Sequence, residues 1–445
     1  MCPALADGTA TIRSVARQRP CMTDSERSPE ADAEASSGNG DANADPATLA
    51  DRVENGELRL YELDDHADAE TAATARRLAV ERRTGVDLSA TGDYAFSAEN
   101  AESNIENMVG GTQLPVGVAG PVTVHGETAD GDYHLPIATT EGALVASVNR
   151  GCSTITAAGG ATARVTKRGM TRAPVFSVDD VAEGAEVIEW VRENEGRLAA
   201  VAEETTRFGE LQEVTPYIVG DNVLLRFSYH TGDANGMNMA TIATRPAAEL
   251  VEEETPASLV ALSGNLCVDK KPAAINAVEG RGHTVTADVT VPRETVEERL
   301  DTTPEAIEAV NTRKNLVGSA KAGSLGFNAQ AANVVAGVFI ATGQDEAHVV
   351  AGSNCITTAE AREDELYASV SLASLQVGTV GGGTDLATQS EALELVGLAG
   401  GGDPPGANAD AFAEVVATGA LAGELSLLSA LASRHLSSAH AELGR

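Results

Sequence analysis

The segment from residue 165 to residue 261 constrains the fold most, because its order of elements fits few architectures. It is expected to contain a strand, a helix, a β-hairpin and a second helix, at about 173–178, 180–206, 211–230 and 237–254. Asp179 can cap the first helix, and Gly220-Asp221-Asn222 separates the two strands of the hairpin. This order predicts a split βαβ sandwich, of ferredoxin-like type, inserted into a larger domain. A Rossmann unit is not expected, since no GxGxxG sequence follows a strand.

The whole chain is predicted to have an α+β fold. We expect a large mixed central domain built around a long helix, the inserted ferredoxin-like small domain, and a helical domain at the N-terminus. A long helix pattern of small residues covers 312–341, a strand is expected at 366–377, and helices are expected at 385–400 and 408–438. The expected boundaries are 1–45 for a disordered acidic extension, 46–105 for the helical domain, 106–164 and 262–445 for the two parts of the large domain, and 165–261 for the inserted domain.

Acidic residues dominate the charge of the chain. It has 66 Asp and Glu residues against 31 Lys and Arg, a formal net charge of −35, and 3% aromatic residues. Self-repulsion of this size should destabilise a compact fold, and salt should screen it. The composition therefore indicates a halophilic protein of a salt-rich cytoplasm, with a generic acidic cytosolic enzyme as the alternative. Nucleic acid and anionic membranes are disfavoured as partners.

Neither a disulfide framework nor a metal site is expected. The five cysteines are scattered, without a CxxC pair or a zinc-like spacing. The longest apolar run, near Val334–Ala341, is shorter than a membrane span. The N-terminus has no apolar stretch of signal-peptide type. Met22 opens the acidic extension and is an alternative start to Met1.

The strongest chemical signal is the segment Ser263-Gly-Asn-Leu-Cys-Val-Asp-Lys-Lys-Pro272. Lysine occurs only five times in 445 residues, yet Lys270 and Lys271 stand side by side after Asp269. An ammonium group is a compact point charge that can polarise one carbonyl oxygen. The weakly charged flanks favour a partly buried loop, although a solvated turn is the plainer interpretation of a lysine pair.

A carboxylate is placed among small and apolar residues in the segment 139–144. A carboxyl group in the setting of Glu141 is expected to be desolvated, which raises its pKa and lets it donate a proton near neutral pH. An acid that stabilises a helix N-terminus is the alternative. Ser147, Asn149 and Arg150 follow on the same element, and Arg150 suits either a phosphate or a surface salt bridge.

Further motifs can hold anionic groups. Arg164 follows a glycine pair and can bind a carboxylate through its two-pronged guanidinium. Residues 232–239 open a helix whose first amides suit a phosphate. The glycines of 378–383 either let a backbone approach a cofactor closely or form a flexible loop. Asp345, just past a helix, and His440, near the C-terminus, are weak signals alone, because such residues are usually solvated.

The order of these motifs closely resembles hydroxymethylglutaryl-CoA reductase, from residue 106 to residue 440. The resemblance rests on PVGVAGP (115–121), ATTEGALVASVNRG (138–151), GGATARV (159–165), GMTRAP (169–174), SGNLCVDKKPAAINAVEGRG (263–282), KNLVGSAKAGSLGFNAQAAN (314–333), ATGQDEA (341–347), SNCITT (353–358) and GTVGGGT (378–384). It implies reduction of hydroxymethylglutaryl-CoA to mevalonate and free CoA with two NADPH, the committed step of isoprenoid and archaeal lipid synthesis. The motif order and the final histidine suggest the NADPH-using class I, in a soluble haloarchaeal form without a membrane anchor.

The resemblance implies a catalytic set of four residues. Lys270 would polarise the thioester carbonyl and stabilise the oxyanion that develops. Glu141 would supply a proton to that oxygen, and Asp345 would hydrogen-bond within the Glu–Lys network, so that the three titrate as a coupled set. His440 would protonate the departing CoA thiolate.

Binding residues are implied in the same way. The large domain would bind the substrate and the inserted domain NADPH. The residues that would hold the hydroxymethylglutaryl group are Arg164, Ser263, Asp269, Lys271, Lys314 and Asn333, and those that would face CoA are Ser147, Asn149 and Arg150. The residues that would lie against the cofactor are Asp233, Gly236, Met237, Asn238, Gly382 and Gly383, with Arg168 or Arg172 as a source of charge for its extra phosphate. The implied assembly is a homo-oligomer, a dimer with shared active sites or a tetramer, with no nucleic acid and no membrane as partner.

Two positions depart from the family pattern. Asn235 stands where the family usually has the first methionine of DAMGMN, and Gln330 stands where it usually has the histidine of FNAHAAN. The first departure changes the cofactor region, and the second removes a titratable group near the substrate, although glutamine can still form hydrogen bonds. Two alternatives to the reductase remain: an acyl-CoA reductase that stops at the aldehyde, and a non-catalytic thioester-binding scaffold.

Overall fold

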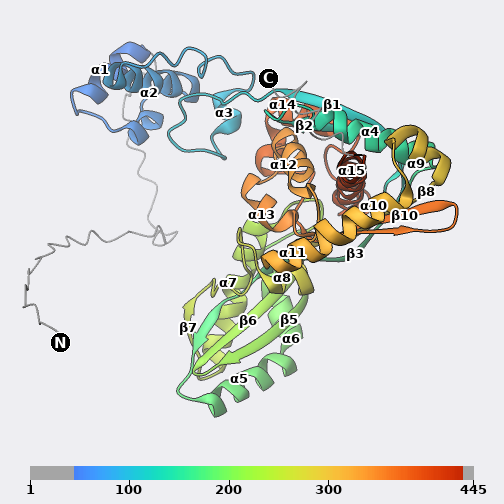
Figure 1. The fold of residues 1–445 in the computed structure, drawn as a ribbon. Helices are drawn as coiled ribbons and strands as arrows, with labels where there is room; N and C mark the ends of the chain where they lie inside the picture. The colour runs from blue at the N-terminus through green and yellow to red at the C-terminus, as the bar shows by residue number, and fades with distance from the viewer. Residues whose placement is uncertain (1–44, 434–445) are drawn as a thin grey trace, which may run out of the picture.

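A computed structural model describes residues 45–433 of the chain, which form three lobes (Figure 1). The first lobe is helical and contains α1 (Pro46–Glu54), the 3₁₀ helix η1 (Leu60–Asp65), α2 (Ala69–Thr84) and α3 (Ala98–Ala101). The Asp68 side chain accepts a hydrogen bond from the Thr71 amide at the start of α2, and Gly85 ends that helix in the left-handed conformation. Leu49, Val53 and Leu63 form a small separate core for this lobe.

One sheet runs through the other two lobes, in the order β7-β4-β6-β3-β8-β10-β9, with the β1–β2 hairpin attached to β3 and β5 attached to β6. The strands of the central lobe are β1 (Val116–His125), β2 (Asp130–Ala138), β3 (Ala161–Arg172), β8 (Gly282–Pro292), β9 (Cys355–Ala361) and β10 (Glu365–Leu375). All pairings are antiparallel except the short contact of β1 with β3. Residues 162–169 of β3 pair with β8, whereas residues 170–172 pair with β6. This single strand therefore carries the sheet from one lobe into the next.

The small lobe has its own apolar core and a βαββαβ order. Its elements are β4 (Val175–Ser177), α5 (Val181–Glu193), α6 (Glu195–Glu203), β5 (Glu210–Val219), β6 (Asn222–His230), α7 (Met237–Glu254) and β7 (Ser258–Ala261). The predicted hairpin is present as β5 and β6. Two details of the prediction were wrong. The helix is capped by Asp180, whose carboxylate accepts the amides of Ala182 and Glu183, and it is interrupted at Asn194.

The central lobe is built around α15 (Ala407–Ala432), which packs against α4 (Leu144–Ala157), α12 (Ala331–Thr342) and the sheet. This helix also corrects the expectation that no segment is long and apolar enough to cross a membrane. An 18-residue window of α15 has a mean hydropathy of 1.7, but 78% of that window is buried inside the described protein. It is the core helix of a lobe, a class of helix that passes the same test of length and composition.

The continuous helix expected at 312–341 was wrong. The segment begins as a π-helical stretch, η2 (Asn311–Gly318), continues as α11 (Ser319–Ala322), and ends at Gly323 in the left-handed conformation. A loop then leads to α12. The loop is held because the buried carboxylate of Glu424 on α15 accepts the amides of Ala329 and Gln330. A glycine therefore ends the first helix, and a distant acid, which no local pattern reveals, holds the loop that follows.

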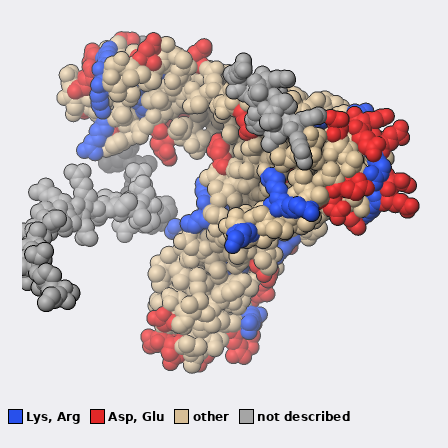
Figure 2. Space-filling view, viewed as in Figure 1, with Lys and Arg blue, Asp and Glu red and all other residues tan. Residues whose placement is uncertain are grey.

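The remaining helices connect and cover these elements. They are α8 (Ala274–Glu279), α9 (Arg293–Leu300), α10 (Pro304–Val310), η3 (Glu346–His348), α13 (Val349–Gly352), η4 (Gly382–Asp385) and α14 (Ala387–Val396). Figure 2 shows acidic side chains gathered at the free end of the small lobe and at the β9–β10 end of the central lobe. Lysine and arginine side chains lie between these two acidic regions, near α10 and α11.

Candidate active site

The turn that presents Lys270 is strained. Between β7 and α8, three residues other than glycine have positive φ: Asn265 at 62°, Val268 at 44° and Lys270 at 55°. Left-handed backbone costs roughly 1–2 kcal/mol for such a residue, and it is least expected for β-branched valine. Strain of this kind persists only where the surroundings fix it, and it gathers at functional sites.

Several hydrogen bonds fix this turn to its neighbours. The Gly264 amide donates to the Ala173 carbonyl at 2.6 Å. The Thr171 hydroxyl donates to the Cys267 carbonyl at 3.3 Å, and the Asn276 amide donates to the Val268 carbonyl at 2.9 Å. The end of β3 and helix α8 therefore hold the loop from both sides.

Lys270 and Asp345 form an ion pair, with Nζ 2.7 Å from Oδ2. Asp345 follows the left-handed Gly343 at the end of α12 and starts η3, where its other oxygen accepts the Ala347 amide. The hydrogen bond to Asp345 raises the pKa of Lys270 above its usual value. Both side chains are partly exposed, at 44% and 36%. The ammonium is thus anchored at one point and remains accessible.

Asp269 binds two buried cationic or polar groups that the sequence analysis did not single out. Its Oδ1 lies 2.9 Å from Nη2 of Arg281 and 2.9 Å from Nε2 of His348. Burial opposes ionisation of Asp269, but the His348 hydrogen bond and the charges of Arg281 and Lys270 outweigh it and lower its pKa to about 2. Arg281 belongs to the EGRG end of the lysine motif, and His348 is one of only eight histidines, so both could have been flagged.

Glu141 lies apart from this cluster. It is exposed in the turn between β2 and α4, so the expectation of a desolvated carboxyl group was wrong for the single chain described. Helix α4 begins only at Leu144, after the left-handed Ala143, which leaves Glu141 in the preceding turn. Within residues 45–433, no hydrogen bond or ion pair joins its carboxylate to Lys270. His440 lies outside the described residues.

The three residues expected to face CoA contact α15 or the β1 strand. Ser147 Oγ lies 2.9 Å from Ser426 Oγ, and Arg150 donates to the Ser426 carbonyl at 2.6 Å. Burial lowers the pKa of Arg150. Asn149 is exposed and accepts the Gly120 amide at 3.0 Å. Hydrogen bonds within the same chain therefore hold these three side chains, two at the C-terminal end of α15 and one at β1.

The residues expected to hold the acyl group fall into two sets. Ser263 and Lys271 lie in the Lys270 loop, where Lys271 Nζ donates to Asn265 Oδ1 at 3.1 Å. Others lie on separate elements of the central lobe. Arg164 donates to the His125 carbonyl at 2.8 Å, exposed Lys314 lies in η2, and Asn333 lies in the first turn of α12. The structure brings the first set to Lys270; it shows no contact of the second set with Lys270 within 45–433.

Asp233, expected at the cofactor, is buried and fully engaged as an acceptor. Its Oδ2 accepts the amides of Gly402 and Gly406 at 3.0 and 2.8 Å, and its Oδ1 accepts those of Asn408 and Ala409 at 3.0 and 3.1 Å. These amides precede and open α15. The carboxylate therefore ties the small lobe to the start of the central helix.

The other expected cofactor residues surround the start of α7. Gly236 caps the helix with φ of 82°, exposed Asn238 lies in its first turn, and the Met237 sulfur lies 2.7 Å from Nη2 of Arg281. Gly382 has φ of 59° and open space where a side chain would be. Gly383 packs so closely on Gly343 that a Cβ there would lie 2.8 Å from the Gly343 carbonyl oxygen.

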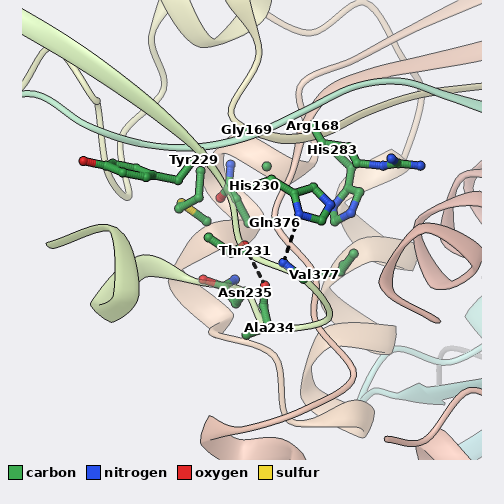
Figure 3. Close-up of a pocket in the computed structure, with 13 residues that line it drawn as sticks. Arg168, Gly169, Tyr229, His230, Thr231, Ala234, Asn235, His283, Gln376 and Val377 are labelled. Carbon is green, nitrogen blue, oxygen red and sulfur yellow. Dashed lines mark hydrogen bonds between the residues drawn. The ribbon is translucent and has the colours of Figure 1, made fainter. Parts of the chain in front are cut away.

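A small cavity of about 20 Å³ lies where the small lobe meets the central lobe (Figure 3). Arg168, His230, His283 and Asn235 are among its lining residues. Arg168 forms an ion pair with Asp410 of α15, so its charge is already compensated. Arg172 donates to the Thr241 hydroxyl of α7 instead. Among the described residues, no group of three His, Cys, Asp or Glu side chains is arranged to hold a metal ion.

Comparisons with known proteins decide the family. The model of "Hydroxymethylglutaryl-coenzyme A reductase" matches residues 72–445. The chain belongs to this family. It is 71% identical to the 3-hydroxy-3-methylglutaryl-coenzyme A reductase of Halobacterium salinarum over 402 residues, which cover 90% of this chain and 99% of that protein. The corresponding enzyme of Haloferax volcanii is 69% identical over 401 residues, which cover 90% of this chain and all of that protein.

Solved structures support the fold. A class II 3-hydroxy-3-methylglutaryl-CoA reductase from Streptococcus pneumoniae, bound to NADPH in open conformations, has a TM-score of 0.62 and 20% identity, and the match covers 80% of this chain and 96% of that one. This likeness shows a mixed α+β fold. The close relatives show the activity: the enzyme is an oxidoreductase that reduces hydroxymethylglutaryl-CoA to mevalonate in the mevalonate pathway.

Proposed function

We propose that this reductase is a class I enzyme that consumes two NADPH per mevalonate and uses Lys270 as its oxyanion-stabilising group. The observation that carries the role of Lys270 is its ion pair with Asp345 at 2.7 Å, on a strained turn that buried partners of Asp269 hold in place. A partly exposed ammonium with one carboxylate partner can still donate two further N–H groups to a carbonyl oxygen.

Lys270 supplies positive charge where negative charge develops. When the thioester or the aldehyde carbonyl is reduced, its oxygen becomes an alkoxide, and a fixed ammonium stabilises that charge more than it stabilises the neutral carbonyl. Asp345 keeps the lysine protonated, in agreement with the raised pKa of Lys270. The pair therefore contributes to the chemical step rather than to substrate affinity.

Proton supply is assigned to residues that lie apart from this pair. Glu141 is proposed to protonate the reduced oxygen, and His440 is proposed to protonate the CoA thiolate as it leaves. Glu141 is exposed in the single chain. We therefore propose a homo-oligomer, a dimer with shared sites or a tetramer, in which this carboxylate would meet a lysine of the partner subunit. The proposed setting is a salt-rich cytoplasm, supported by the net charge of −35.

The residues around α7 fit a dinucleotide. The first amides of this 18-residue helix, the open backbone at Gly382 and the nearby guanidinium of Arg172 offer donors for phosphates without a Rossmann motif. NADPH bound there supplies the hydride for each reduction step. Met237 and Asn238 would hold it at the helix start, and Asp233 is proposed to shape the site by fixing the loop before α7.

The test is NADPH oxidation with hydroxymethylglutaryl-CoA in a potassium chloride series. Two NADPH consumed per CoA released would support full reduction, whereas one would indicate an enzyme that stops at the aldehyde. Lys270→Ala should reduce kcat by at least about a thousandfold, a loss of roughly 4 kcal/mol of transition-state stabilisation. Lys167→Ala is the matched control, because Lys167 on β3 is an exposed lysine with only a 3.8 Å ion pair to Glu279. A Lys270→Ala enzyme with more than about a tenth of the wild-type kcat would reject the assignment.

A further inference from the structure

We propose that His348 and Asn235 form a positioning pair that holds Asp269, and through it the strained turn of Lys270. This inference rests on the proposed role of Lys270 and adds two residues to which that role assigns no part. Asn235 is one of the two departures from the family pattern, where a methionine is usual. A methionine side chain would have no N–H to donate to His348 at this position.

The hydrogen bonds define the tautomer of His348. Its side chain is fully buried, with Nε2 2.9 Å from Asp269 Oδ1 and Nδ1 3.3 Å from the Asn235 side-chain nitrogen. An amide nitrogen is a donor only, so Nδ1 accepts and the imidazole proton is on Nε2, directed at Asp269. The same principle fixes ligand histidines in metal sites, where the partner of one ring nitrogen sets the tautomer of the other.

A second acid lies near the ring but does not replace Asp269 as its partner. Asp345 Oδ2 is 4.0 Å from His348 Nε2, and the same oxygen pairs with Lys270 at 2.7 Å. Nε2 therefore has Asp269 Oδ1 as its hydrogen-bond acceptor, and a hydrogen on Nδ1 would face the Asn235 amide donor.

The position of Asp269 depends on the hydrogen bond from His348, because its other partner, Arg281, is itself held by few hydrogen bonds. Arg281 is fully buried, and within residues 45–433 its Nε and Nη1 atoms have no hydrogen-bond partner. Asp269 immediately precedes Lys270, whose φ is 55°. Removing the His348 donor leaves Asp269 with Arg281 alone, so the turn can relax and move the ammonium away from the reacting carbonyl. The effect should appear in kcat, since a displaced ammonium weakens binding of the transition state more than binding of the substrate.

The first experiment compares His348→Gln with His348→Phe in molar salt. Glutamine can donate to Asp269 and accept from Asn235, whereas phenylalanine fills the space without hydrogen bonds. We expect the Phe enzyme to lose at least about tenfold in kcat with KM for hydroxymethylglutaryl-CoA within about twofold of wild type, and the Gln enzyme to keep more than about a third of wild-type kcat. Equal losses in the two enzymes, or an unchanged kcat in the Phe enzyme, would overturn the proposal.

The second experiment tests the coupling and does not require the Phe variant to fold. Asn235→Leu removes the donor at Nδ1, so the ring is held from one side only, and kcat should fall at least about threefold with KM within about twofold of wild type. Asn235→Gln keeps an amide donor and is the control, which should retain more of the wild-type kcat. An unchanged kcat in the Leu enzyme, or equal losses in the two enzymes, would contradict the pair. Lys270→Ala measured in parallel separates this inference from the proposed role of Lys270. If the Lys270→Ala enzyme stays active, the proposed role of Lys270 is wrong. If it is inactive and the changes at His348 and Asn235 leave kcat unchanged, only this inference is wrong.

Discussion

Replacing Asp233 by asparagine decides whether this residue anchors a helix or binds the cofactor. In the structure its carboxylate accepts four backbone amides at the start of α15, all within 3.1 Å. Asparagine keeps one oxygen and replaces the other by an NH₂ group. Two of the four amides would therefore face a donor instead of an acceptor.

The expected loss of stability can be worked from these contacts. Two buried amides without an acceptor cost about 1–3 kcal/mol each, and the two that remain lose the charge of their acceptor, at about 0.5–1 kcal/mol each. Loss of a negative charge at a helix N-terminus adds up to about 1 kcal/mol. We expect a loss near the low end of this sum, about 4 kcal/mol, because the loop can partly relax. For a lobe of this size, that corresponds to a fall of roughly 10 °C in the thermal midpoint.

The assay is thermal unfolding in molar potassium chloride, with KM for NADPH measured in the same preparations. Asp180→Asn is the control, because Asp180 caps the exposed start of α5 through two amides and asparagine caps such a helix about as well. The control should change the midpoint by less than about 2 °C. An Asp233→Asn enzyme with an unchanged midpoint and a raised KM for NADPH would refute the anchoring argument and favour a direct cofactor contact.

Three further expectations follow from the charges. Asp269→Asn should cost about 2 kcal/mol of stability above pH 4, because the fold lowers the pKa of Asp269 from 3.8 to about 2. The difference in stability from wild type should disappear as the pH falls through that range, and acid titration of unfolding would measure it. The unfolding midpoint of the wild type should rise from low to molar potassium chloride, and a constant midpoint would reject the halophilic interpretation. NADPH should exceed NADH by at least about tenfold in kcat/KM, and Arg172→Gln should remove the preference without lowering the NADH rate.

Local patterns predicted the elements whose signals are local. The β5–β6 hairpin was found because alternation and a turn sequence lie within 20 residues, and the end of α12 at Gly343 was placed because a glycine with positive φ stops a helix. Asp345 could be placed beside Lys270 only through the resemblance, since 75 residues separate them in the sequence. Arg281 and His348 were missed because their importance comes from burial, which depends on how α8, η3 and the lysine loop meet.

The prediction that the Glu141 carboxyl group is desolvated was wrong for a related reason. Its small and apolar neighbours suggested burial, but Leu144 turns inward while Glu141 remains in the turn before the helix. Neighbours in sequence do not define the environment of a turn residue, because a turn can leave one residue exposed and bury another three positions later.

The central helix shows how an acidic chain uses carboxylates inside as well as outside. α15 carries three buried acids, and each is satisfied by a different part of the fold. Glu414 accepts three amides of the β1–β2 turn, and Glu424 accepts those at the start of α12. Asp410 pairs with Arg168 and His283.

Backbone amides are the main donors to Glu414 and Glu424, whereas Asp410 pairs with an arginine. An amide network has a consequence that a lysine pair would not have. Amides cannot leave their place without moving the loop that carries them, so Glu414 and Glu424 each fix a loop. Asp233 completes the arrangement from the small lobe, by holding the start of the same helix. The loop before α7, which carries candidate cofactor residues, and the loop that leads into α12 and Asn333 are therefore positioned against one rigid element. A change at Asp233 or Glu424 should disturb the site through loop geometry before it unfolds the protein.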